Sequence, residues 1–430
     1  MKMRRRTTAV LGIALAAATV TGLTACGPGG GGQVSEDGSG NVVVWYLPDD
    51  ADFIAKVKPA FEKDNPGTTL EVVSVPEDNY VTKIDTAMLA QQPPDVVFEY
   101  EAKWIKSGRV LPVDDIMADA GVDMSVFNRV AMAECVFEGK TYCMGTLSGP
   151  VMLIYNKAMF DAAGLAYPSA TEPMTIDQFA ETARALTVPD PDINKQVYGG
   201  LVSGPRNGIL SWDAFFGADG KSAVGNLDSD RTIHFFDVMS QLSREGVNST
   251  PAVSELKPDS DVLATGNAAM SVTDLVVAAR AMDEAGLPWG AAPPPVIEAG
   301  DEPYGFVGTD KYSALKGGKN NLGAEKFLVW LAKNGSKVRM DIGMPPLDST
   351  LLPEWAGDSE GRQQSIEVQS VIQKGNIFVP QYWTISEDFA DVYTQLANGE
   401  ETDAAAALKE LAPKLQDKLD AAWADWDAIK

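Results

Sequence analysis

The chain has few histidines and cysteines for its length. Among 430 residues there are three cysteines and one histidine, His234. A single histidine excludes the paired-histidine zinc sites of metalloproteases and disfavours a Ser-His-Asp triad. His234 lies in the apolar run Ile233–Phe236, and we interpret it as a packed core residue rather than a metal ligand. The sequence also lacks a Gly-x-x-x-x-Gly-Lys-Ser/Thr phosphate loop. We therefore expect no metal and no other cofactor.

Basic residues are scarce too. The chain has 35 lysines and arginines against 60 acidic residues, which gives a net charge of −25. This balance argues against nucleic-acid binding, which uses basic patches to neutralise phosphates. It also argues against docking on anionic lipid by charge. A chain of this length exceeds the roughly 250–300 residues at which single cores stop growing, so we expect two domains.

The N-terminus is typical of an exported protein. A basic cluster at Lys2–Arg6 precedes the apolar stretch Ala9–Val20 and then Leu23–Cys26, which predicts a secretory signal peptide over residues 1–25. Leu-Thr-Ala-Cys resembles the bacterial lipobox, in which the cysteine becomes the lipidated first residue. Cys26 would then anchor the chain to the outer face of the membrane of a Gram-positive bacterium, through the flexible, Gly-rich linker at residues 26–40. The alternatives are an ordinary signal peptide and an uncleaved anchor.

The two remaining cysteines, Cys135 and Cys143, flank a predicted hairpin. Glu138-Gly139-Lys140 lies at its turn, and residues that flank such a turn can face each other at disulfide distance. An oxidising compartment favours the disulfide over two free thiols.

Strands and helices alternate along the chain. The first part predicts strands at Asn41–Tyr46, Thr69–Val75 and Asp95–Phe98, separated by helices at Ala51–Asp64 and Asn79–Gln91. This alternation indicates an α/β domain with a largely parallel sheet. The pattern restarts near residue 150 with a strand at Val151–Tyr155. Further helices are expected at Ile176–Leu186, Arg231–Glu245, Asp274–Ala285, Ala324–Lys333, Gly361–Gln373, Glu387–Ala397 and Thr402–Ile429, the last broken near Pro413.

Several segments, in this order and spacing, resemble the extracellular solute-binding proteins of ABC importers. The resemblance is to the carbohydrate-binding group that includes maltose-binding protein, and it covers most of residues 42–418. The segments that carry it are Phe61–Gly67, Pro94–Phe98, Gly139–Tyr142, Leu153–Lys157, Phe160–Leu165, Thr175–Phe179, Gly266–Met270 and Ala324–Leu331.

The resemblance implies an α/β, two-lobed periplasmic-binding-protein fold of type II, with three crossovers between the lobes. We place the crossovers near Thr146–Pro150, Gly305–Gly308 and Gly375–Pro380. The N-terminal lobe would comprise residues 41–146 and 309–376, and the C-terminal lobe residues 147–308 and 377–430. The ligand would bind in the cleft, and the lobes would close on it by a hinge motion.

A sugar site needs polar side chains for the hydroxyls and aromatic rings for the C–H face. The first candidates follow the first strand. The resemblance aligns Asp49 with a sugar-binding aspartate, although Asp49 or Asp50 could instead cap the next helix. A second cluster follows the strand Asp95–Phe98, where this chain departs from the maltose-binding pattern. Trp104, in the same segment, could instead be a core residue of the next helix. The candidates of these two clusters are Trp45, Tyr46, Asp49, Asp50, Glu99, Glu101 and Lys103.

Other candidates lie at the crossovers and on the second lobe. Trp212 is a stacking candidate with burial as the alternative, and Asp274 is either a ligand contact or a helix cap. Trp383 either stacks on sugar or packs at the lobe interface. The full set is Ser148, Asn207, Trp212, Asp274, Phe306, Trp383 and Glu387.

These observations predict a lipid-anchored, monomeric substrate-binding protein that delivers an oligosaccharide to ABC permease subunits. It would contact the membrane only through its lipid and would not bind nucleic acid. Three alternatives keep the fold but change the ligand to a polyamine, another cation or a peptide. A secreted glycoside hydrolase is the enzyme alternative, since two carboxylates suffice for that chemistry.

Overall fold

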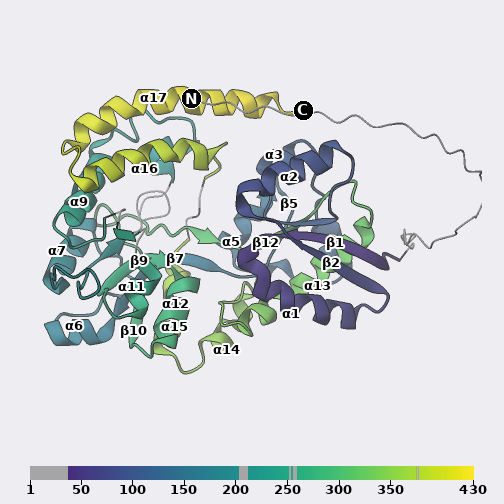
Figure 1. Ribbon diagram of the computed structural model, residues 1–430, viewed down its shortest axis with the longest axis horizontal. Helices are drawn as coiled ribbons and strands as arrows, with labels where there is room; N and C mark the ends of the chain where they lie inside the picture. The colour runs from purple at the N-terminus through teal and green to yellow at the C-terminus, as the bar shows by residue number, and fades with distance from the viewer. Residues whose placement is uncertain (1–36, 203–211, 251–252, 255–258, 374, 376) are drawn as a thin grey trace, which may run out of the picture. The chain divides into compact units, whose positions relative to one another are not determined.

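The computed structural model describes residues 37–202, 212–250, 253–254, 259–373, 375 and 377–430. These residues form a mixed α/β fold around two five-stranded sheets (Figure 1). Within the described ranges, no helix combines the length and apolarity that crossing a membrane requires.

The first sheet has the strand order β2-β1-β3-β12-β6. Strand β1 pairs in parallel with β2 and β3, whereas β12 pairs antiparallel with β3 and β6. The expected parallel sheet therefore holds for the first three strands only. The sheet is mixed because β12 comes from much later in the chain and runs in the opposite direction. Its strands are β1 (Gly40–Tyr46), β2 (Thr68–Ser74), β3 (Val96–Phe98), β6 (Met144–Gly145) and β12 (Lys311–Ala314).

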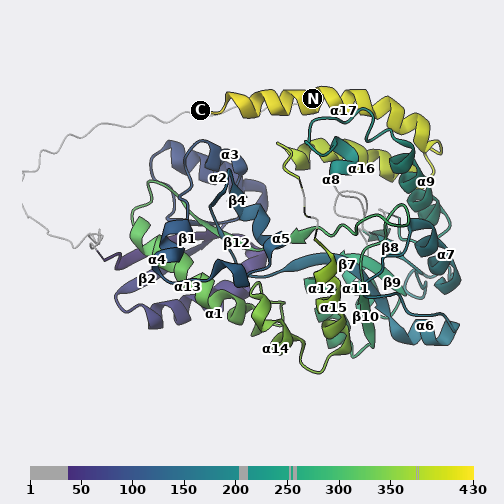
Figure 2. The same ribbon diagram turned by 180° about the vertical axis from the view of Figure 1, so that it is seen from behind.

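Helices pack around this sheet with their apolar sides inward. Helix α1 buries Phe53, Ile54, Val57 and Phe61, which recur at helical spacing. Helix α13 packs on α1 and on the sheet. Figure 2, which views the molecule from the opposite side, shows this helix beside the strands of the first sheet. The elements of this region are η1 (Pro48–Asp50), α1 (Ala51–Asp64), α2 (Glu77–Leu89), α3 (Ala102–Lys106), α4 (Asp114–Asp119), η2 (Met124–Val126), α5 (Arg129–Met132), η3 (Ala133–Cys135), the hairpin β4 (Val136–Phe137) and β5 (Lys140–Thr141), α13 (Asn321–Met340), η4 (Ser349–Leu351) and α14 (Leu352–Ala356).

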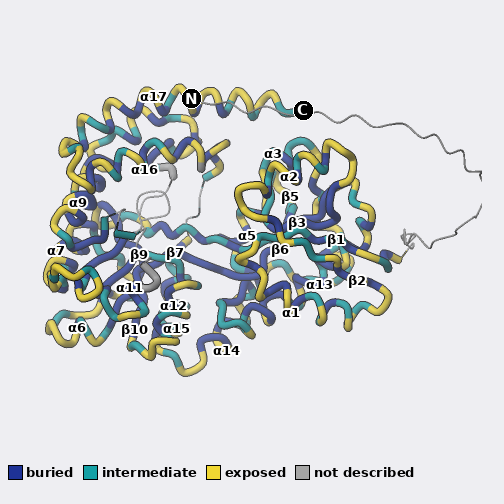
Figure 3. Tube along the Cα trace, in the orientation of Figure 1, coloured by how far each residue is buried: buried dark blue, intermediate teal, exposed yellow. Residues whose placement is uncertain are grey.

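The second sheet has the order β10-β7-β9-β8, and β11 also pairs with β7. Strand β7 is the centre, antiparallel to β9, β10 and β11, and every one of its residues is buried. Figure 3 shows β7 as a buried strand, whereas the outermost helix α17 (Ala404–Ala428) is exposed along much of its length. The strands are β7 (Gly149–Asn156), β8 (Leu201–Val202), β9 (Met270–Asp274), β10 (Trp289–Ala292) and β11 (Val307–Gly308).

The helices of the second region agree closely with the sequence predictions. Helix α7 begins with a capping box, in which Thr175 and Gln178 satisfy each other's backbone N–H groups. The chain also forms one long C-terminal helix. The helices are α6 (Lys157–Ala163), α7 (Ile176–Leu186), α8 (Trp212–Phe216), α9 (Asp230–Arg244), α11 (Asp259–Ala264), α12 (Leu275–Glu284), α15 (Glu360–Val371), α16 (Tyr382–Asn398) and α17 (Ala404–Ala428).

Two expectations about these helices are wrong. His234 is exposed on α9 and its Nε2 lies 3.1 Å from Asp177 Oδ1. It shares the outer stripe of the helix with Asp237 and Gln241, three and seven residues on, while Phe235 and Phe236 face the core. Helix α17 also continues through Pro413. Its buried side chains, among them Leu408, Leu411, Leu415 and Leu419, pack into one core, and this packing outweighs the lost backbone hydrogen bond.

The strand connections bear on the proposed division into lobes. The chain passes from β6 in the first sheet to β7 in the second, and returns from β11 to β12. Helix α15 packs against β10 of the second sheet, where Gln364 Oε1 lies 3.3 Å from the backbone nitrogen of Ala291. The division and the three crossovers remain predictions, and these contacts favour moving the end of the N-terminal lobe from residue 376 to before residue 360.

Candidate functional site

One cavity collects predicted site residues together with both kinds of chemistry that sugar binding needs. It has a volume of about 480 Å³, within the roughly 300–1,000 Å³ typical of small-molecule sites. It is lined by the loop after β3, the segment from α5 to β4, the start of β12, and residues on both sides of the α16 N-terminus. The side chains that matter most are Glu99, Tyr100, Glu101, Glu134, Phe137, Lys311, Phe378 and Tyr382.

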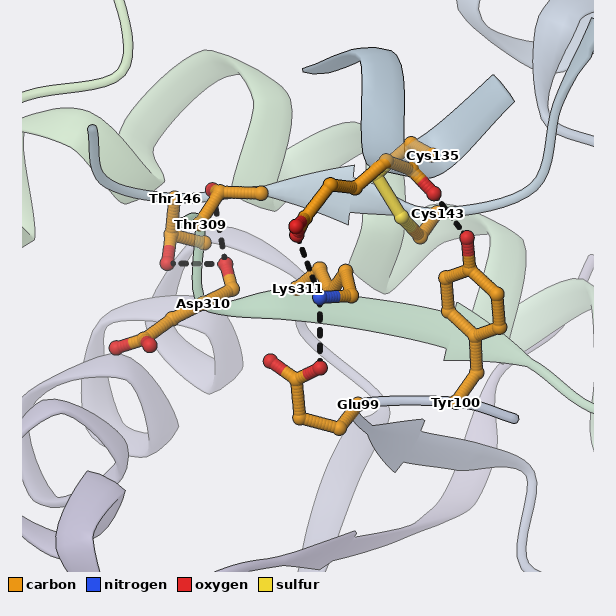
Figure 4. Close-up of a disulfide and its surroundings, with 9 residues drawn as sticks. Glu99, Tyr100, Cys135, Cys143, Thr146, Thr309, Asp310 and Lys311 are labelled. Atoms are coloured by element: carbon orange, nitrogen blue, oxygen red, sulfur yellow. Dashed lines mark hydrogen bonds and ion pairs between the residues drawn. A yellow bond between two sulfur atoms is a disulfide. The ribbon is translucent and has the colours of Figure 1, made fainter. Parts of the chain in front are cut away.

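A lysine joins two carboxylates at this cavity. Lys311 Nζ lies 2.7 Å from Glu99 Oε2 and 3.0 Å from Glu134 Oε2 (Figure 4). The lysine side chain is 12% exposed, against 34% for Glu99 and 26% for Glu134. Each carboxylate therefore uses one oxygen on the lysine and remains partly open to solvent. The three residues come from β12, the loop after β3 and η3, so the fold brings together positions 99, 134 and 311.

The backbone at Glu99 is held in an uncommon conformation. Its φ is 57°, in the left-handed region that side chains other than glycine rarely adopt. The backbone N–H of Glu99 donates to the carbonyl oxygen of Lys311 at 2.8 Å. Burial raises the pKa of the Glu99 carboxyl to about 7, and the neighbouring Lys311 ammonium opposes this rise. Strained, polar positions at a cavity are typical of functional sites.

Tyr100 fixes the wall beside the lysine. Its hydroxyl donates to the backbone carbonyl of Glu134, and its ring centroid lies 5.9 Å from Lys311 Nζ. Figure 4 shows the phenol reaching toward the disulfide from the loop that carries Glu99. Cys135 and Cys143 form this disulfide, with Cα atoms 5.1 Å apart. The bond therefore anchors the residue next to Glu134 and the hairpin that carries Phe137.

Asp50 has a different environment from the one expected of a ligand contact. It is 2% exposed, and its Oδ1 lies 2.6 Å from Nη1 of the equally buried Arg339. The hydroxyl of Tyr312 also donates to its carboxylate. Arg339 further contacts Asp310 Oδ2 at 2.9 Å and donates from Nε to Thr146 Oγ1 at 3.0 Å. Asp50 makes no side-chain cap for α1, so it serves a buried ion network and not the cap considered above.

The other first-region candidates lie apart from this cavity. Trp45 and Tyr46 are half-buried, and Asp49 is exposed. Lys103 pairs with Asp85 at 2.9 Å. Trp104 is 2% exposed and its Nε1 donates to Asp85 Oδ1 at 2.7 Å, which confirms the core alternative. Of the two predicted clusters, only Glu99 and Glu101 line the cavity.

The second-region candidates are also dispersed. Asp274 caps α12, since its Oδ1 accepts from the Val276 N–H at 2.7 Å. A Cβ added at Gly149 would lie 2.9 Å from Asp274 Oδ2. The start of β7, which follows the connection from β6, therefore packs closely against the Asp274 side chain. Ser148 is 1% exposed, Phe306 is partly buried and Glu387 is exposed. Asn207 and the side chains of Trp212 and Trp383 lie outside the described part of the chain.

The sequence reasoning missed Lys311 and Glu134. Lys311 is a charged residue that opens the otherwise uncharged strand segment Lys311–Leu315, and this contrast could have singled it out. Glu134 precedes Cys135 and carries no such signal. Its role depends on the hairpin and on β12, which meet only in the folded chain.

The arrangement gives no support for catalysis. A Gly-x-Ser-x-Gly match exists at residues 357–361, but its Ser359 caps α15 and follows helix α14 rather than a strand. A nucleophile elbow requires the strand-to-helix turn. In the described ranges, no three His, Cys, Asp or Glu side chains are grouped so that they could hold a metal ion.

Comparison with known proteins identifies the class. Residues 45–338 match the family described as bacterial extracellular solute-binding protein, and the chain belongs to this family. Members of the family bind transported solutes and are not enzymes. A binding protein of Brucella abortus is 29% identical over 131 residues, which cover 30% of this chain and 31% of that protein. The match thus spans about a third of the curated relative.

Solved structures share the fold over most of the chain. The substrate-binding protein Lmo0181 of Listeria monocytogenes, solved with cycloalternan, has a TM-score of 0.72 at 19% identity, covering 88% of this chain and 99% of its own. The sugar-binding protein MalE of Xanthomonas citri has a TM-score of 0.72 at 18% identity, covering 90% and 100%. UgpB of Mycobacterium tuberculosis, solved with glycerophosphocholine, has a TM-score of 0.71 at 17% identity, covering 89% and 99%. These likenesses establish the two-lobed periplasmic-binding-protein fold of type II.

Proposed function

We propose that this chain is the lipid-anchored binding component of an ABC importer and captures a carbohydrate, an oligosaccharide, in the cavity at Glu99 and Lys311. The observation that carries the proposal is that one cavity is lined both by carboxylates held in place by Lys311 and by aromatic side chains. Carboxylate oxygens accept hydrogen bonds from hydroxyls, and rings bury the C–H face of a sugar. The cycloalternan bound to the Listeria protein is an oligosaccharide on the same fold.

The mechanism follows from the placement of these groups. The carboxylates and Lys311 belong to the first region, whereas Phe378 and Tyr382 flank the start of α16, which packs on α9 and α17. A sugar that contacts both sets stabilises the closed arrangement of the lobes by its differential affinity. Closure then presents the loaded protein to the permease, with no covalent step.

A thermal-shift screen over mono- and oligosaccharides, followed by calorimetry on the hits, tests the ligand class. We expect saturable binding of at least one sugar, weakened about tenfold or more in Lys311→Met, since the two carboxylates lose their shared partner. Lys326→Met, a change of an exposed residue on helix α13 outside this cavity, is the matched control and should keep wild-type affinity. Saturable heat with putrescine and none with any sugar would refute the carbohydrate assignment in favour of a polyamine.

The anchor is tested separately from the ligand. In the native host, Cys26→Ala should move the protein from the membrane fraction to the medium, because the chain as a whole has a net charge of −25 and no electrostatic attraction to anionic lipid. A Cys26→Ala protein that stays in the membrane fraction would contradict lipid anchoring and leave the sugar proposal untouched.

A further inference from the structure

The charges that line the cavity do not balance. Among the described lining residues, Glu99, Glu101 and Glu134 carry carboxylates, and Lys311 carries the one ammonium. Lys311 Nζ contacts both Glu99 and Glu134, at 2.7 and 3.0 Å, so a single positive charge is shared between two negative ones. This cluster retains a net negative charge when its members are ionised.

Glu101 adds a third carboxylate to the lining, and this residue is partly open to solvent. Lys103, whose charge attracts the Glu101 carboxylate, is already paired with Asp85 at 2.9 Å. Within the described residues, the Glu101 side chain forms no hydrogen bond or ion pair. It lies one residue beyond Tyr100 on the same loop, so it lines the cavity beside the Glu99–Lys311–Glu134 cluster.

The uncharged walls of the cavity are of the kind that accept cations. Four aromatic rings line it: Tyr100, Phe137, Phe378 and Tyr382. The face of an aromatic ring attracts an ammonium group within about 6 Å of its centroid. Tyr100 already lies 5.9 Å from the Lys311 ammonium, and Phe378 is 42% exposed, which leaves part of its ring accessible to a ligand.

Ligand binding makes this imbalance matter. A sugar that fills the cavity displaces water from the carboxylates, and a buried charge without a partner is costly. A positively charged group on the ligand offsets that cost, whereas a neutral ligand does not reduce it. An acidic ligand adds repulsion between its own charge and the carboxylates. We propose that this cavity selects sugars that carry a protonated amino group over neutral and acidic sugars with the same skeleton. The proposal rests on the proposed function and narrows its ligand class.

Matched sugars test the charge directly. Calorimetry on the full chain would compare β-1,4-linked dimers and tetramers of glucosamine, N-acetylglucosamine and glucose. The monosaccharides glucosamine, galactosamine and mannosamine would be compared with their neutral and uronate counterparts. We expect the best amino sugar to bind about tenfold or more tightly than its neutral counterpart in 20 mM salt. The advantage should shrink severalfold in 200 mM salt, because salt screens charge interactions at partly exposed sites.

A pair of variants identifies the carboxylate responsible. Glu101→Gln should reduce the amino-sugar preference severalfold, whereas Glu367→Gln, an exposed change on α15 away from the cavity, should leave it unchanged. Neutral sugars that bind as tightly as their amino counterparts would overturn this proposal and leave the proposed function standing, as would a preference insensitive to salt and to Glu101→Gln. Absence of binding by every sugar, whatever its charge, would overturn both.

Discussion

The two sheets of this protein are stabilised in different ways. Around the first sheet, charges are buried: Arg339 lies 2.6 Å from Asp50 with its guanidinium 3.6 Å from the Phe53 ring centroid. Around the second sheet, aromatic side chains fill the core, as where Phe215 stacks on Phe389 with centroids 4.6 Å apart. The buried charges sit beside β12, which also supplies Lys311. A buried ion network thus fixes β12 in the first region, while ring packing dominates the core of the second region around α8 and α16.

Breaking the buried ion network should have the largest effect on stability. Arg339→Met leaves Asp50 buried without its partner, and we expect a loss of about 3–5 kcal/mol in the free energy of unfolding. Urea denaturation followed by circular dichroism measures it. The double variant Asp50→Asn, Arg339→Met should regain much of the loss because the fully buried charge of Asp50 is also removed, and Asp310, which loses the same partner, is 34% exposed. A single variant within 1 kcal/mol of wild type would show that the pair carries little of the first region's stability.

Removing an aromatic from the second core provides the counterpart. Phe389→Ala deletes a fully buried ring and should cost about 3–4 kcal/mol through lost burial and the remaining cavity. Because no charge is involved, this loss should be the same at pH 5 and pH 8, unlike that of Arg339→Met. Equal pH dependence for both variants would remove the distinction between the two cores.

The disulfide should contribute less. Replacing Cys135 and Cys143 with serine opens a loop between residues eight apart, and the loss of this cross-link should cost about 2 kcal/mol. Sugar affinity should fall as well, since the bond anchors the segment that carries Glu134. Titrating the sugar into the oxidised and the reduced wild-type protein gives a second measurement without substitution. If the serine variant and the reduced wild-type protein both bind sugar as tightly as the oxidised wild-type protein, the hairpin does not contribute to sugar binding.

The buried carboxyl groups predict a small dependence of the free energy of unfolding on pH. Burial raises the pKa of Asp274 to about 6, above the value near 3.9 of an unfolded chain. Between these values the folded state binds the proton that the unfolded state releases, so stability falls as pH rises from about 4 to 6. Asp274→Asn should flatten this part of the stability profile. A profile unchanged by the substitution would assign the dependence to other groups, such as Asp50, whose pKa burial also raises to about 6.

Most of the fold, but little of the site, was accessible from the sequence. Helix α7 was predictable because Thr175, Gln178 and the apolar spacing after them act locally. His234 was misplaced because its neighbours Phe235 and Phe236 are apolar, although the helical period turns its own side chain outward. For Asp50 the sequence predicts a ligand contact or a helix cap, because nothing local points to its partner Arg339, nearly 290 positions away. The Glu134–Lys311 contact likewise joins distant segments, and no local pattern indicates it.

The most direct test of the central claim is a crystal structure of the full chain with the tightest sugar found in the screen. We expect the sugar in the cavity at Lys311, with hydroxyl or amino groups within hydrogen-bond distance of the Glu99 and Glu134 carboxylates and one ring face on Tyr100, Phe378 or Tyr382. A sugar bound elsewhere, such as the hollow between α6 and α7 lined by Tyr167 and Asp301, would contradict the account.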